Sequence, residues 1–181
     1  MQQARYSTVA MTLHWLIAVL VLVNWLIPQE LEGMPHEQFM DAMSPHKALG
    51  LIIFVLVLLR LAWRLTNKPP ALASSLKPWE RMLATGVHWA FYVLLLAMPV
   101  IGYVANSYDD SGVDIFGLFT IPGLSVPTDD HLAHEIYDLH GTLGTILLIL
   151  VAVHALGSLK HTFLDKDGNL FRMLPWGTPK G

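Results

Sequence analysis

Four long stretches of the chain are apolar and free of Asp, Glu, Lys and Arg. They run from residue 6 to 29, 48 to 59, 82 to 108 and 139 to 159. The second stretch is short, but Arg60 and Arg64 at its far end have side chains that can reach the membrane interface. Because about 20 apolar residues cross a bilayer as a helix, we expect membrane helices at about 8–27, 46–65, 82–106 and 136–160.

Prolines and glycines mark the expected helix ends. Pro28 and Gly33 are expected to end the first helix and Pro69 with Pro70 the second, since proline lacks a backbone donor. Pro99 is expected to kink the third. The first stretch is interpreted as a retained helix, because it is longer than a signal-peptide core and no small-residue cleavage site follows it.

Positive charge is segregated along the chain. With four spans, all but one of the 11 Lys and Arg residues fall on the side that holds both termini, and Lys47 alone falls on the other. This asymmetry predicts that both termini are cytoplasmic. The outward loops 28–45 and 109–135 are acidic, and the longer loop, rich in Gly and Pro, is expected to form a structured outer cap.

The amino-acid composition limits the kinds of cofactor that such a bundle can bind. The 181 residues are 54% hydrophobic and 14% charged, which is typical of a membrane protein, and their number suits one domain, 1–181. The absence of cysteine excludes disulfides, thiolate metal sites, iron–sulfur clusters and covalent c-type haem. A bound metal cofactor would therefore depend mainly on His, Met or carboxylate ligands, and the chain has nine histidines.

Four histidines fall in two pairs at matching depths of the predicted bundle. His140 and His154 lie on the last helix, separated by about 21 Å and within about 40° of the same face. His46 matches His140 near the outer surface, and His14 matches His154 near the cytoplasmic surface. For a single histidine, a hydrogen bond between helices is an equally good explanation, but two depth-matched pairs favour two haems with two histidine ligands each.

Other residues have both a functional and a simpler interpretation. Arg60, Arg64 and Arg81 on the inside, and Lys47 outside, are candidates to bind haem propionates or simple interfacial cations. His88 and His161 at the cytoplasmic rim are candidates for a quinone site or proton exchange, or polar anchors. Small residues near the ligands make room for a flat ring or for close helix packing, namely Gly50, Gly141, Gly144, Ala155 and Gly157. His36, His131 and His134 are expected to be surface residues, although the last two have a spacing that could bind a metal.

The ordered motifs resemble those of the bacterial cytochrome b561 family. They include Leu13-His14-Trp15, His46 opening the second helix, Arg60-Leu-Ala-Trp-Arg64, and His88 ahead of Tyr92. The motifs Pro99-Val-Ile-Gly102, the His140 and His154 spacing, and Leu170-Phe-Arg-Met-Leu-Pro175 continue the likeness. It is collinear over nearly the whole chain.

The resemblance implies an all-α, integral membrane four-helix bundle of the bacterial inner membrane that encloses two b-type haems. His14 and His154 would ligate the cytoplasmic haem iron, and His46 and His140 the periplasmic one. Some members pass electrons from superoxide to ubiquinone, which implies an oxidoreductase, whereas others relay electrons between quinone and partner proteins. We expect lipid, quinone and either superoxide or a redox partner protein as partners, and no nucleic acid. The outer loop from Tyr108 to Glu135 departs most from the family, so no substrate site there follows from the resemblance.

Overall fold

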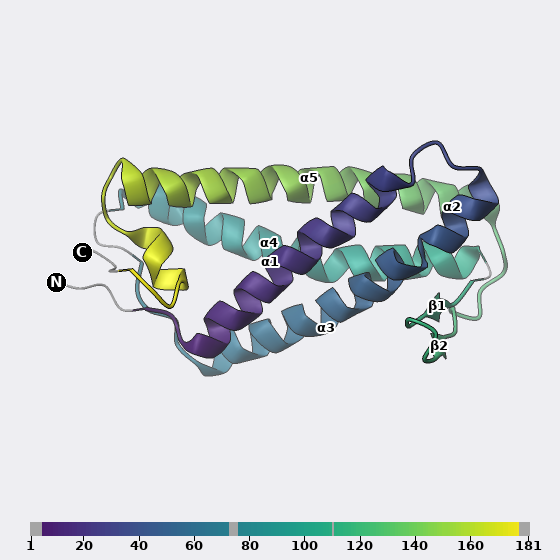
Figure 1. The fold of residues 1–181 in the computed structure, drawn as a ribbon, viewed down its shortest axis with the longest axis horizontal. Coiled ribbons are helices and arrows are strands. Elements are labelled where there is room, and N and C mark those ends of the chain that lie inside the picture. Colours follow the sequence, from purple (N-terminus) through teal and green to yellow (C-terminus); the bar gives the residue numbers. More distant parts are fainter. Residues whose placement is uncertain (1–4, 73–75, 110, 178–181) are drawn as a thin grey trace.

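The computed structural model describes residues 5–72, 76–109 and 111–177 and is dominated by four long helices. These are α1 (Thr8–Glu30), α3 (Ser44–Thr66), α4 (Pro78–Tyr108) and α5 (Asp130–Phe163). All four are long and apolar enough to cross a membrane. They form an elongated bundle whose helices run along a common long direction (Figure 1). The predicted all-α, four-helix membrane fold is therefore confirmed.

Each long helix extends beyond the range expected from its apolar stretch, and side-chain acceptors cap the starts of three of them. Ser7 accepts the Ala10 amide hydrogen at the start of α1, and Asp129 accepts that of Leu132 at the start of α5. Glu80 accepts the Lys77 amide hydrogen where α4 begins. Such side-chain acceptors satisfy amides that the first turn leaves without a partner.

The expectation that Pro28 breaks the first helix is wrong, because α1 continues through Pro28 to Glu30. Proline has no amide hydrogen to donate within a helix, but only one intrahelical hydrogen bond is lost when it lies in the last turn. α4 likewise runs through Pro99 to Tyr108.

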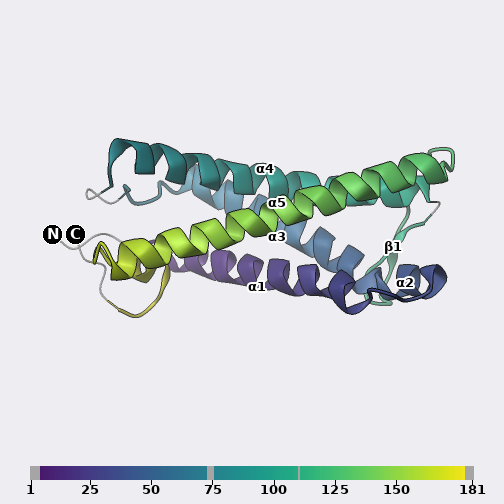
Figure 2. The ribbon, with the colours of Figure 1, turned by 90° about the horizontal axis from the view of Figure 1, so that it is seen from above.

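Short elements lie near the two ends of the bundle. At the end away from the termini, which is the outer end in the predicted topology, lie α2 (His36–Ala42) and an antiparallel hairpin of β1 (Val113–Asp114) and β2 (Thr120–Ile121). At the opposite end lies the 3₁₀ helix η1 (Asn169–Met173). Figure 2, a view from above, shows the same separation of the short elements along the bundle. α2 and η1 were not expected from the sequence.

The 3₁₀ helix η1 stabilises the end of the bundle that carries both termini. The Tyr6 amide donates to the Arg172 carbonyl over 3.1 Å, and the Trp15 indole donates to the Met173 carbonyl over 2.7 Å. The buried Arg172 side chain donates to the Ala71 carbonyl over 2.7 Å and lies 5.7 Å from the Tyr6 ring centre. The tail thereby ties α1 to the segment between α3 and α4.

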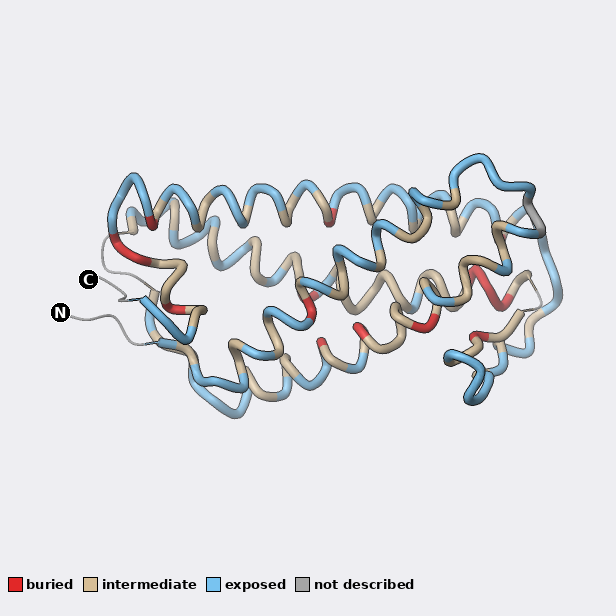
Figure 3. The backbone as a smooth tube through the Cα atoms, in the orientation of Figure 1, coloured by how far each residue is buried: buried red, intermediate tan, exposed pale blue. Residues whose placement is uncertain are grey.

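Helix packing is uneven within the bundle. α4 packs closely along α5, α1 along α3, and α3 along α4, whereas α5 does not pack closely along α1 or α3. The small buried core is formed by Ile17, Ile53, Val57 and Tyr92. Figure 3 shows that few residues of the long helices are buried and that the rest are intermediate or exposed, and large apolar side chains are common among the exposed ones. Such a surface suits contact with lipid chains.

Candidate functional site

The structure brings His14 of α1 next to His154 of α5 near the end that carries η1. Their ring centres are 6.2 Å apart and the ring planes are inclined by 76°. The two helices that carry these rings are not among the closely packed pairs. The imidazoles therefore approach each other across the space between two packed helix pairs, α1 with α3 and α4 with α5.

A second pair, His46 of α3 and His140 of α5, lies toward the outer end. Its ring centres are 6.0 Å apart and its planes are inclined by 74°, nearly the geometry of the first pair. A metal bound by two imidazoles through bonds of about 2 Å separates two five-membered rings by about 6 Å between centres. Each pair therefore has the spacing that one metal ion between two imidazoles requires.

The Nδ1 atom of His46 has a defined partner. It lies 2.9 Å from the backbone oxygen of Asn24 in α1, and because a carbonyl can only accept, Nδ1 is the protonated nitrogen. The neutral ring then keeps Nε2 free as a metal ligand. The Asn24 oxygen is available because residue 28, whose amide would normally bond to it in the helix, is proline.

Gly102 of α4 makes room for the His140 ring. A methyl group at Gly102 would lie 3.2 Å from Cε1 and 3.3 Å from Nδ1 of His140, which is closer than comfortable van der Waals contact. In the sequence, Gly102 stands out only as part of a motif, and Asn24 does not stand out at all. Gly102 follows Pro99 by about one helical turn, and a glycine within a membrane helix is the sequence signal that a neighbouring group could approach the backbone closely.

Two further rings surround His154. The His88 ring centre is 5.6 Å away at an angle of 69°, and the Phe91 ring centre is 5.4 Å away at 81°. His88, placed at the cytoplasmic rim by the sequence, thus faces the inner histidine pair. Phe91 was not singled out, because an aromatic residue in an apolar helix is unremarkable in sequence.

Arg60 and Arg64 line a partly polar pocket of about 410 Å³ between α1, α3 and α4. Arg60 donates to the Ala10 carbonyl over 2.9 Å, one turn before His14. The Arg64 guanidinium lies 5.9 Å from the ring centre of Tyr92. Arg60 lies within electrostatic range of His14 and His154, and Arg64 within range of His88. Lys68 also lines this pocket, and no carboxylate does so within the described residues.

The other predicted cations lie elsewhere. Lys47 is half-buried at the outer end, within electrostatic range of Asp41 and Asp109. Arg81 donates to the Leu76 carbonyl over 3.2 Å at the start of α4. The structure thus gives Lys47 acidic neighbours and places Arg81 in the first turn of α4.

His161 belongs to an ionic cluster rather than to the His88 environment. Its Nδ1 lies 2.7 Å from the Asp165 carboxylate, and Lys160 binds Asp165 over 2.8 Å and Glu80 over 3.0 Å. The hydrogen bond from Lys160 holds the pKa of the Asp165 carboxyl below its usual range. This cluster, exposed to water in part, connects the end of α5 to the start of α4.

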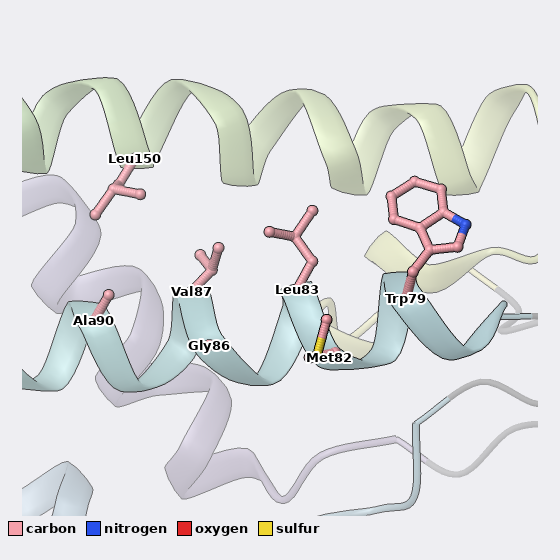
Figure 4. A pocket seen from close by; sticks show the side chains of 7 residues that line it. All are labelled: Trp79, Met82, Leu83, Gly86, Val87, Ala90 and Leu150. Carbon is pink, nitrogen blue, oxygen red and sulfur yellow. The ribbon is translucent and has the colours of Figure 1, made fainter.

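Two other expectations concern groups outside this region. His134 has its Nδ1 2.6 Å from the Asp130 carbonyl, and the highly exposed His131 lies 3.7 Å from Glu135, so each has a local partner at the start of α5. A separate apolar groove of about 490 Å³ is lined by six residues of α4 and by Leu150 of α5 (Figure 4). It holds no titratable side chain and is distinct from the histidine pairs.

The comparisons with known proteins agree with this architecture. The family model for prokaryotic cytochrome b561 matches residues 5–176. The chain is 31% identical to cytochrome b561 homolog 2 of Escherichia coli, with 94% of this chain and 91% of the relative covered. It is 30% identical to the probable superoxide oxidase CybB of Yersinia pestis, with coverages of 94% and 96%, and 26% identical to cytochrome b562 of Cereibacter sphaeroides, with coverages of 96% and 97%. With its four membrane-spanning helices and paired histidines, the chain belongs to the prokaryotic cytochrome b561 family, whose members bind haem b and transfer electrons across membranes.

Proposed function

We propose that this protein carries electrons through two haem b groups, one near each surface of the bacterial inner membrane. His14 and His154 would hold the cytoplasmic haem, and His46 and His140 the periplasmic haem. The observation that carries the proposal is the pair of equal spacings, 6.2 and 6.0 Å between ring centres. Both spacings suit one iron between two imidazoles, and His140 and His154 share one helix about 21 Å apart.

Haem iron bound by two histidines supplies one-electron exchange between its ferric and ferrous states. The protein's own part is to position the ligands and the ring substituents. The Asn24 carbonyl orients His46, and the lack of a side chain at Gly102 leaves room for the His140 ring. Arg60 and Arg64 would bind the propionates of the inner haem, and Lys47 those of the outer haem, because guanidinium and ammonium groups pair with carboxylates.

Superoxide is the proposed electron donor and ubiquinone the proposed acceptor. Two superoxide anions give one electron each and leave as dioxygen, and the two electrons with two protons convert ubiquinone to ubiquinol. The name of the Yersinia pestis relative, a probable superoxide oxidase, supports this choice of donor.

The quinone is proposed to react at the cytoplasmic end. His88 lies against His154, at the place where an electron would leave the inner haem. His161 hydrogen-bonds Asp165, whose side chain is about one-third exposed, so this pair can exchange protons with water. In this arrangement His88 faces the electron path and His161 supplies protons from the rim.

A second candidate function is a cytochrome subunit that relays electrons between quinone and a partner protein. The acidic outer end favours it, because Asp129, Asp130 and Glu135 are exposed there and Lys47 has two acidic neighbours. An acidic surface repels superoxide and attracts a basic redox protein.

The distinguishing experiment uses purified protein in detergent. Haem content is measured first, and reduction by enzymatically generated superoxide is then followed with and without a ubiquinone analogue. Two b haems per chain with quinone-dependent turnover would support the oxidoreductase. Two haems that superoxide does not reduce, or reduces without quinol formation, would favour the relay subunit. Fewer than two haems would contradict the two-site proposal.

A further inference from the structure

The outer hairpin carries an apolar tip that its own fold leaves uncovered. Between β1 and β2 the chain reads Ile115-Phe-Gly-Leu-Phe119. The exposed fractions are 52% for Phe116, 79% for Leu118 and 59% for Phe119. Three large apolar side chains on five residues of loop are unusual for a surface that meets only water.

The backbone of this tip satisfies several of its own polar groups. Ile115 donates to the Phe119 carbonyl over 2.8 Å, and Leu118 donates to the Ile115 carbonyl over 3.0 Å. The Gly117 amide donates to the Asp114 carboxylate over 2.8 Å. Amides that are already paired lower the cost of moving the tip from water into a less polar medium.

The hairpin is fixed at the side of the bundle. Val113 at its base is 2% exposed, and β1 packs against α3. Figure 1 shows the hairpin beside the outer ends of α3 and α4, not stacked beyond them. The tip therefore lies laterally, next to helices that cross the membrane, at the level where their outer ends emerge.

We propose that the tip formed by Phe116, Leu118 and Phe119 inserts into the interfacial layer of the outer leaflet. Aromatic and large aliphatic side chains favour this layer, where apolar groups bury about 5–10 Å deep. A charged partner protein fits the tip less well, because Asp114 is the only charged residue from Ser111 to Thr128 and its carboxylate already binds Gly117.

Insertion would anchor the outer cap to the membrane. The buried Asn106 side chain at the end of α4 donates to the Ser111 and Gly112 carbonyls over 2.6 and 3.1 Å, which joins the hairpin to that helix. Tyr103 also donates to the Pro122 carbonyl over 2.6 Å. A lipid anchor at the tip would thus hold the cap against the outer ends of α3 and α4.

The absence of cysteine permits a direct test. Leu118→Cys is labelled with an environment-sensitive fluorophore in full-length protein, at one copy per lipid nanodisc. Thr128→Cys, exposed in the same outer segment, is the matched control. Quenching of the fluorophore is measured with three quenchers. A nitroxide near the top of the lipid acyl chain reports a shallow position, a nitroxide at the end of the chain reports a deep position, and iodide reports exposure to water. Helix content and haem spectra establish that both variants are folded.

The expected result is a blue-shifted emission from position 118, with strong quenching by the shallow nitroxide and weak quenching by iodide. Position 128 should show the opposite pattern. Quenching of position 118 by iodide as strong as at position 128 would overturn the proposal. A blue shift that appears only when several copies share a vesicle would also overturn it, because a second copy would then cover the tip.

Discussion

His46 donates from Nδ1 to the backbone oxygen of Asn24 over 2.9 Å, although the two residues lie on different helices. The bond exists because Pro28, four residues after Asn24, has no amide hydrogen to offer that oxygen. A hydrogen bond at Nδ1 raises the basicity of a metal-binding imidazole and fixes its orientation. A proline that in sequence was expected to end a helix thus leaves free the carbonyl oxygen that orients His46, the proposed haem ligand on the neighbouring helix.

Replacement of Pro28 by alanine should weaken this control of His46. The new amide would compete for the Asn24 oxygen, lower the basicity of His46, and raise the midpoint potential of the outer haem by tens of millivolts. The inner haem should keep its potential. A redox titration that resolves the two haems measures the shift, with Gln29→Ala in the same helical turn as control. Equal shifts of both haems would contradict the proposed link.

Single replacements of the four histidines should separate the two haems. His154→Ala should remove the inner haem and leave the outer one, whereas His140→Ala should do the reverse, because each deletes one ligand of one pair. Pyridine-haemochrome assays should then give about half of the wild-type haem content. His131→Ala, at a highly exposed position, is the control. Full haem content in both variants would refute the pairing.

Gly102→Ala should affect the outer haem selectively. The added methyl group would meet His140 Cε1 at 3.2 Å and Nδ1 at 3.3 Å, so the ring must shift by a few tenths of an ångström. We expect reduced retention or an altered spectrum of the outer haem, while the inner haem is unchanged. Gly86→Ala is the matched control on the same helix, because nothing lies within 4 Å of its new methyl group. Similar behaviour of both variants would show that the contact is unimportant.

Much of the fold could be predicted because membrane spans are limited by simple physics. Charge-free stretches and the distribution of Lys and Arg were enough to predict four helices and their order. The depth of each histidine also followed from helix rise, and the structure places His14 beside His154 and His46 beside His140. The rise and rotation per residue of a helix determine how deep in the membrane a residue lies and which face it occupies. Residues of different helices that lie at the same depth can therefore be recognised as possible pairs.

Contacts that depend on backbone groups and distant segments could not be predicted. The Asn24 carbonyl carries no signal in a side-chain pattern, and its role requires the packing of α1 on α3. The 3₁₀ helix that binds Tyr6 and Trp15 is short and joins opposite ends of the chain. His88 and His161 seemed equivalent in sequence, but one faces His154 and the other binds Asp165, because they lie at different depths and on different helices.

Acidification should weaken the ionic cluster of Lys160, His161, Asp165 and Glu80. The pKa of Asp165 is lowered in the folded protein, first by its hydrogen bond from Lys160. Its contribution to stability is therefore fully present above the usual carboxyl pKa of about 3.9. That contribution is lost as the pH falls through the lower folded value. In detergent, the midpoint of thermal unfolding should fall over this pH range, and it should fall less steeply in Asp165→Asn. At neutral pH the midpoint of Asp165→Asn should be only slightly lower than that of the wild type, because the pair is partly exposed. Asp138→Asn, at an exposed position of α5, should keep the wild-type profile, and an unchanged profile in Asp165→Asn would show that the cluster contributes nothing to folding.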